Sequence, residues 1–124
     1  MVHLRDHLTE QEFRDLFRDA YDEGTFRIAA LFDEGACRAV AGYRIHTNLV
    51  SGKHLYVDDL VTDPAVRSRG YGRALNDYLV GLARSAGCAS IQLDSGVYRP
   101  DAHRFYFRER YTISAFHFKR LLES

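Results

Sequence analysis

The segment from Leu60 to Arg73 places the strongest constraint on the fold, because it predicts a strand, a turn and a helix in direct succession. Leu60 and Val61 lie in an apolar run, and Pro64 ends it because proline cannot donate to a strand ladder. A turn rich in arginine and glycine then leads into apolar residues at helical spacing. The N-terminus of a helix carries unpaired amides and about half a positive charge, so it binds anions. The segment therefore predicts an anion site at a helix start, and pyrophosphate suits it well.

The glycines of this turn favour a phosphate ligand, because Gly70 and Gly72 let the backbone approach it without a Cβ in the way. Direct positive charge would come from three arginines: Arg67, Arg69 and Arg73. A Walker A loop needs Gly-Lys-Ser/Thr, which is absent. A dinucleotide-binding fingerprint needs a third glycine where this chain has Leu75. A glycine-rich turn that binds no ligand remains an alternative.

Hydrophobic periodicity along the chain predicts an α/β fold. A capping box at Thr9–Glu12 begins a helix that Gly24 ends, and Gly87 ends a second helix. The predicted strands are 25–32, 36–46, 54–62, 88–94 and 112–122, and a third helix spans 100–110. This order predicts one domain over residues 1–124, an α/β sandwich of the α+β type, in which helices flank a mixed, mostly antiparallel central sheet.

The charges are unevenly distributed, although 17 basic and 17 acidic residues give a formal net charge of zero. Residues 1–66 hold 12 acids and 7 bases, whereas residues 67–124 hold 5 acids and 10 bases. Zero net charge argues against a dedicated nucleic-acid binder, and the positive half leaves room for a small polyanion. No stretch is long and apolar enough to span a membrane, and the N-terminus lacks the apolar core of a signal peptide. These features predict a cytoplasmic protein.

Cysteine and histidine spacing gives no indication of a metal site. Cys37 and Cys88 form no C-x-x-C pair, and the six histidines are scattered. In a cytosolic chain two such cysteines are more often buried thiols than a disulfide. We therefore expect no metal and two buried thiols.

Two motifs resemble the GNAT superfamily of N-acetyltransferases. The pattern Arg67-x-x-Gly70-x-Gly72, between a strand and a helix, resembles the acetyl-CoA loop of that family. The run Ala102-His103-Arg104-Phe105-Tyr106 resembles its Ala-x-x-Phe-Tyr motif on the helix after the fifth strand. The element order is also similar, so the resemblance covers about residues 9–122.

The resemblance implies a role for each matching position in an acyl-CoA-dependent N-acyltransferase. Its co-substrate would be acetyl-CoA, and the acetyl group would pass directly to a primary amine. Tyr106 would protonate the departing thiolate, which a phenol can do. The backbone of three residues would pair with the pantetheine arm: Leu60, Val61 and Thr62. The pyrophosphate would be held by the Arg67 side chain and by the amides of Ser68, Arg69, Gly70, Tyr71, Gly72 and Arg73.

The amine must lose a proton before or during attack, so the reaction needs a general base. Asp58 and Asp59 lie where the family often places acids, on the strand before the loop. Adjacent strand residues point to opposite faces, so only one can face the acceptor unless a bulge intervenes. The choice between them stays open, since Asp59 could also pair with an arginine. Lesser candidates are Tyr98, Asp94 and His103.

Several positions depart from the family pattern. Arg99 stands where the family usually has asparagine, and Arg110 where it has glycine. A left-handed Arg110 would cost about 1 kcal/mol relative to glycine. At most residues 2–5 could form the family's first strand, and only one strand follows the last helix. Sheet edges left open in this way invite pairing with a second chain, so we predict a homodimer.

Two other functions compete with an acetyltransferase. The run Arg69-Gly70-Tyr71-Gly72 matches the start of an RNA-binding strand motif, but the following residues have helical spacing, which disfavours an RNA partner. A protein of this family that binds CoA without transfer is the second alternative. The acceptor cannot be read from the sequence, although the acidic first half suggests a cationic one.

Overall fold

The structure is a computed structural model that describes residues 10–22, 24–63 and 70–122. The chain divides into two compact units, Met1–Leu93 and Asp94–Ser124. The first unit contains α1 (Glu10–Asp22), β1 (Phe26–Asp33), β2 (Ala36–Asn48), β3 (Gly52–Thr62), α2 (Tyr71–Ser85) and β4 (Ser90–Leu93). The second unit contains α3 (Pro100–Arg108). No described helix is long and apolar enough to cross a membrane.

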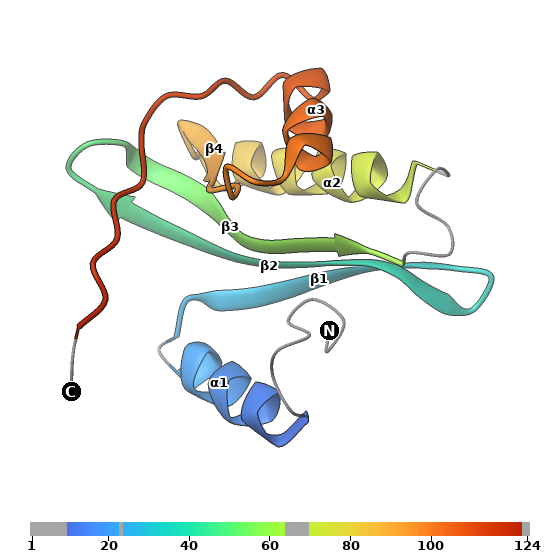
Figure 1. Cartoon of the computed structure of the whole chain (residues 1–124). Coiled ribbons are helices and arrows are strands. Elements are labelled where there is room, and N and C mark those ends of the chain that lie inside the picture. The colour runs from blue at the N-terminus through green and yellow to red at the C-terminus, as the bar shows by residue number, and fades with distance from the viewer. Residues whose placement is uncertain (1–9, 23, 64–69, 123–124) are drawn as a thin grey trace. The chain divides into compact units, whose positions relative to one another are not determined.

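The first unit is built on a mixed sheet with the strand order β1-β2-β3-β4 (Figure 1). β1, β2 and β3 are antiparallel neighbours, and β4 runs parallel to β3. This arrangement confirms the predicted mixed, mostly antiparallel sheet. β1 and β4 form the edges of the described sheet. Residues 2–5, where a further strand could form, lie outside the described residues, and the homodimer stays a prediction.

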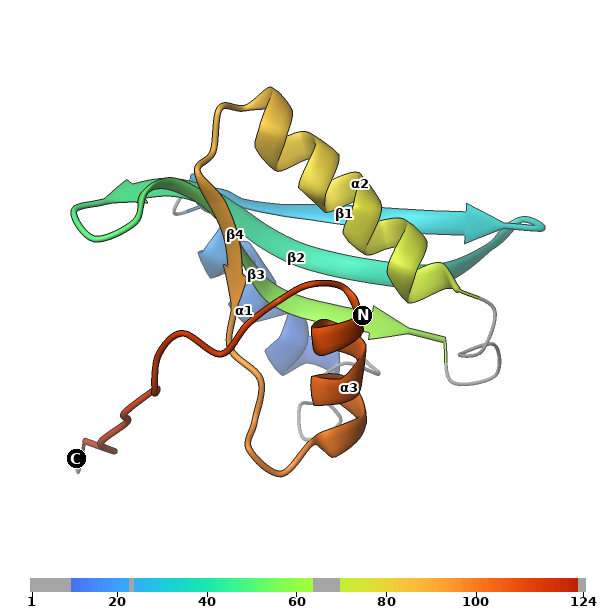
Figure 2. The same cartoon turned by 90° about the horizontal axis from the view of Figure 1, so that it is seen from above.

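The core of the first unit lies between α2 and one face of the sheet, while α1 lies on the opposite side (Figure 1). Ala41, Leu55 and Leu79 are fully buried. The same cluster is completed by Ala39, Val57, Leu75 and Ala83. Seen from above, α2 crosses the strands obliquely (Figure 2). Burial of these side chains fixes the position of α2 on the sheet, and therefore also the position of its start after Gly70.

Local turn chemistry accounts for the ends of the elements. Glu34 and Gly35 both have positive φ, 55° and 77°, so they form the tight two-residue turn that suits a twisted hairpin. Gly87, with φ 77°, ends α2, and the Cys88 N–H donates to the Ala83 carbonyl at 2.9 Å. Gly24 has φ 95° just beyond α1. The predicted helix ends are therefore confirmed, whereas Thr9 of the capping box lies outside the described residues.

In the second unit the end of α3 agrees with the prediction, but the segment that follows it does not. Arg110 takes φ 72°, and the Tyr111 N–H donates to the Tyr106 carbonyl at 2.9 Å, so α3 ends in the left-handed cap expected at Arg110. The predicted strand over 112–122 is wrong, because these residues have no regular secondary structure. Their large apolar side chains are exposed: Ile113, Phe116, Phe118, Leu121 and Leu122. A strand needs a ladder partner, which the apolar pattern alone does not supply.

The expectation of two buried thiols is also wrong. Both cysteines are free, but Cys37 is exposed and Cys88 is only partly buried. Cys37 lies at the register shift in the β1–β2 ladder, next to the hairpin turn. Within the described residues no group of three or more metal-ligating side chains occurs.

Candidate functional site

The end of β3 leaves one backbone edge open. β4 pairs only with His54–Val57, and no described strand pairs with the β4 side of β3 beyond that point. β4 runs away from the second half of β3 (Figure 2). The three residues expected to meet a pantetheine arm, Leu60, Val61 and Thr62, lie on this stretch and are partly exposed. The stretch therefore offers N–H and C=O groups to an extended ligand.

The start of α2 has the features of an anion site. Gly70 precedes the helix with φ 78° and ψ 15°, a left-handed conformation that glycine adopts without strain. Among the described residues no side chain caps this end, and the first turn carries no acid. Tyr71 is partly buried, Gly72 is buried and Arg73 is exposed. Three of the expected pyrophosphate contacts lie outside the described residues: Arg67, Ser68 and Arg69.

A bulge in β3 changes the relation between the two adjacent acids. Gly42 pairs with Asp59, but the next residue of β2, Tyr43, pairs with Val57. Asp58 is therefore the extra residue, and the strict alternation of faces is broken at this point. The sequence had allowed for such a bulge but gave no sign of its position.

Asp58 is held by Arg44. The Arg44 guanidinium donates three hydrogen bonds to the Asp58 carboxylate, at 2.8 to 3.2 Å, and stacks 5.2 Å from the centre of the Tyr56 ring. Such a bidentate pair fixes the position of the carboxylate. The sequence analysis missed Arg44, because only the strand register shows that it faces Asp58.

Asp59 and the aromatic ring of Phe26 both lie close to Gly42. A Cβ at Gly42 would come within 2.7 Å of that ring and 3.7 Å of Asp59 Oδ2. Any larger residue at position 42 would displace the ring. Gly42 is therefore needed here for the close approach of the Phe26 ring.

Tyr106 lies on α3, in the second unit. Its ring packs edge-on against Phe105 and Tyr111, with centroid distances of 5.4 and 5.5 Å. Burial raises the pKa of the Tyr106 phenol above its usual 10, and Arg99 lowers it by a smaller amount. Burial also raises the pKa of Tyr111, to which Tyr106 and Glu109 add. Both phenols are protonated at neutral pH and can donate a proton.

The lesser candidates for the base have other contacts. Asp94 Oδ2 lies 3.1 Å from Nδ1 of His117, and His103 Nε2 lies 2.7 Å from the Gly96 carbonyl oxygen. Tyr98 is 82% exposed. A role for any of the three in proton transfer stays a prediction.

The chain belongs to the acetyltransferase (GNAT) family, whose model matches residues 2–110. This membership confirms the resemblance and agrees with the observed fold. It defines the class of protein, a family of N-acetyltransferases that uses acetyl-CoA.

Two N-acetyltransferases are similar to this chain in sequence. The chain is 35% identical over 121 residues, 97% of its length and 85% of the relative's, to the uncharacterized N-acetyltransferase YhdJ of Bacillus subtilis. It is 38% identical over 66 residues, 53% of its length and 43% of the relative's, to the aminoalkylphosphonate N-acetyltransferase of Salmonella typhimurium. The structure of the aminoglycoside N-acetyltransferase AAC(6')-Iy in complex with CoA superposes with a TM-score of 0.80 at 13% identity, covering 97% of this chain and 84% of that one.

Proposed function

We propose that this protein transfers an acetyl group from acetyl-CoA directly to the primary amine of an acceptor. The observation that carries the proposal is the backbone edge at Leu60–Thr62, which has no described strand partner on its β4 side and precedes the glycine-led start of α2. A pantetheine arm can pair with such an edge as an added strand does. The α2 amides, with Arg67, would then hold the pyrophosphate.

The reaction exchanges one bond for another at the acetyl carbonyl carbon. The amine nitrogen attacks this carbon, so that a C–N bond forms and the C–S bond to CoA breaks. The nitrogen loses one proton, and the leaving sulfur gains one. In this proposal Tyr106 supplies the proton that the sulfur gains, since its raised pKa keeps the phenol protonated at neutral pH.

We assign the general base to Asp59 rather than to Asp58. The Asp58 carboxylate is already held by three hydrogen bonds from Arg44, and taking up a proton would break that pair. The register shift separates the environments of the two acids. Asp59 would accept the amine proton directly or through a water molecule.

The acceptor class can be found by screening amines. The purified protein is incubated with acetyl-CoA and one amine at a time, and free thiol is measured. An aminoalkylphosphonate and an aminoglycoside are included because relatives act on such molecules, and a polyamine and a lysine peptide extend the range. We expect thiol release with at least one amine. CoA binding in calorimetry without thiol release from any amine would favour a non-catalytic CoA-binding protein, and absence of CoA binding would overturn the proposal.

Replacing each acid in turn tests the assignment of the base. Asp59→Asn should lower kcat by about 10²- to 10⁴-fold, which is the usual contribution of general base catalysis. Part of this loss should return at higher pH, where more of the amine is already deprotonated. Asp58→Asn is the matched control, and it should lower stability through Arg44 while most of the turnover remains. The reverse pattern would assign the base to Asp58.

A further inference from the structure

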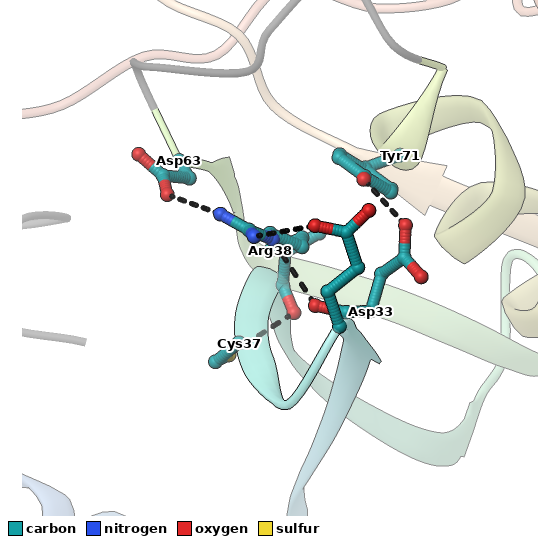
Figure 3. Close-up of polar contacts among 7 residues, drawn as sticks. Asp33, Cys37, Arg38, Asp63 and Tyr71 are labelled. Carbon is teal, nitrogen blue, oxygen red and sulfur yellow. Dashed lines mark hydrogen bonds and ion pairs between the residues drawn. The ribbon is translucent and has the colours of Figure 1, made fainter.

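The end of β3 and the start of α2 both contact the β1–β2 hairpin. After β3, Asp63 Oδ2 lies 3.5 Å from Nη1 of Arg38, and the Asp63 N–H donates to the Arg38 carbonyl at 2.8 Å. At the start of α2, the Tyr71 hydroxyl donates to Asp33 Oδ2 at 2.6 Å (Figure 3). Asp33 and Arg38 belong to one hairpin, so one structural element contacts both the end of β3 and the start of α2.

Arg38 also ties the hairpin turn together. Its Nε donates to the Asp33 carbonyl at 3.3 Å, and its Nη2 lies 3.9 Å from Glu34 Oε2. Arg38 is the extra residue at the register shift in the β1–β2 ladder, and its side chain is only 18% exposed. One guanidinium therefore links the turn to the end of β3 (Figure 3).

We propose that the side chains of Asp33, Arg38, Asp63 and Tyr71 form a clamp that positions the start of α2 for the pyrophosphate of CoA. This inference rests on the proposed function. The four side chains need not touch the phosphates, so they act as positioning groups, whereas the Tyr71 backbone amide is among the expected pyrophosphate contacts. A helix start that is fixed before binding loses less conformational freedom when the ligand arrives, and the affinity rises accordingly.

The charges of the clamp support the same role. Arg38 lies beside the carboxylates of Glu34 and Asp63, and the Asp33 carboxylate contacts Tyr71 in the first turn of the helix expected to bind a polyanion. Left alone, these acids would repel such a ligand. Arg38 neutralises part of this charge, and the Tyr71 hydroxyl donates to Asp33. The acids can therefore anchor the start of α2 without opposing the ligand.

The test compares CoA with pantetheine, which lacks the pyrophosphate, in calorimetric titrations of the full chain. Tyr71→Phe and Asp33→Ala should each weaken CoA binding by about three- to tenfold, the range expected for loss of one ordinary, exposed hydrogen bond. Pantetheine affinity should not change. Both changes remove the same hydrogen bond. The CoA affinity of the double variant should therefore equal that of the single variant with the lower affinity. Tyr78→Phe, which removes an exposed hydroxyl from the same helix, is the matched control.

Arg38→Gln tests the ionic half of the clamp. It should weaken CoA binding more than Tyr71→Phe does, and the loss should shrink at high salt because the uncovered carboxylates are then screened. Arg38→Lys should restore part of the affinity. Unchanged CoA affinity in the variants, or equal losses for CoA and pantetheine, would overturn the clamp. Failure of the unaltered protein to bind CoA would instead overturn the proposed function.

Discussion

The first unit, residues 1–93, and the second, residues 94–124, bury their apolar side chains to very different degrees. The first has a core of fully buried side chains, among them Leu55 and Leu79. In the second, none of the described residues is buried, and Phe116 and Phe118 are 86% and 93% exposed. By itself, the second unit has no comparable core.

The first unit therefore supplies most of the folding stability, whereas the groups expected to take part in the reaction lie in both units. The strand edge, the helix start and the adjacent acids are fixed by the core of the first unit. Tyr106 lies on α3, whose nine residues are fewer than the roughly 12–15 that an isolated helix needs in water. Changes in the first core should therefore alter unfolding, whereas loss of one hydroxyl in the second unit should alter turnover alone.

The largest effect is expected from Tyr106→Phe. If Tyr106 donates the proton to the leaving thiolate, its loss should lower kcat by about 10²- to 10⁴-fold. CoA affinity and the melting temperature should hardly change, because the ring contacts remain. Thiol release with the amine found by screening measures kcat, and calorimetry measures CoA binding.

Tyr111→Phe provides the control for this change. Tyr111 packs against Tyr106, and burial raises the pKa of its phenol as well, but the family motif does not include it. Its variant should keep most of the turnover. Equal turnover in Tyr106→Phe and the unaltered protein would remove Tyr106 from the mechanism and leave the second unit without a chemical role.

The next effect is on stability, from Leu79→Ala in the first unit. Leu79 is fully buried between α2 and the sheet, so the cavity should cost about 2–5 kcal/mol of unfolding free energy. Ile113→Ala in the second unit, at 72% exposure, should change it by less than about 0.5 kcal/mol. Urea denaturation gives both values. Similar losses for the two variants would contradict the contrast between the units.

The features that could be predicted from the sequence depend on local chemistry. The end of α1 at Gly24, the end of α2 at Gly87 and the glycine-led start of α2 at Gly70 each involve a few neighbouring residues. Their backbone conformations follow from residue type, because positive φ favours glycine. For the same reason the cap at Arg110 could be expected from its place in the family pattern.

The features that could not be predicted depend on partners far away in the chain. The apolar spacing of 112–122 predicts a strand, but no ladder partner follows from it. Asp58 pairs with Arg44 only because of the β2–β3 register, and Tyr71 meets Asp33 across 38 positions. Such contacts are set by tertiary packing, which a single sequence does not specify.

A smaller effect is expected at the end of α3. Arg110 takes the left-handed conformation, with φ 72°, which costs a residue with a Cβ about 1 kcal/mol relative to glycine. Arg110→Gly should therefore strengthen the helix end and slow amide exchange in α3. Arg108→Gly removes the same charge from the last residue of the helix, where glycine favours the helical conformation less than arginine does, so it should have the opposite effect. A loss of protection in both variants would show that the arginine charge matters more than the backbone.

The smallest effect is a pH dependence in the first unit, at His46. Its Nδ1 is buried without a hydrogen-bond partner among the described residues, and its ring centroid lies 4.3 Å from that of His54. Burial lowers the pKa of His46 below 6.5, His54 and Arg44 lower it further, and Asp58 acts in the opposite direction. The folded protein therefore holds His46 neutral where the unfolded chain would already take up a proton.

The sign of the effect follows from this difference in proton binding. Above the unfolded pKa of about 6.5 the contribution of His46 to stability is fully present, and it is lost as the pH falls through that value toward the lower folded pKa. Urea denaturation at pH 7.5 and at pH 5.5, about one unit on either side of the unfolded pKa, measures the effect. The free energy of unfolding should be lower at the more acidic pH. His46→Gln should flatten this slope. If the slope is unchanged in that variant, other groups account for it, and the sheet face of the first unit then tolerates a charged His46 as readily as solvent does.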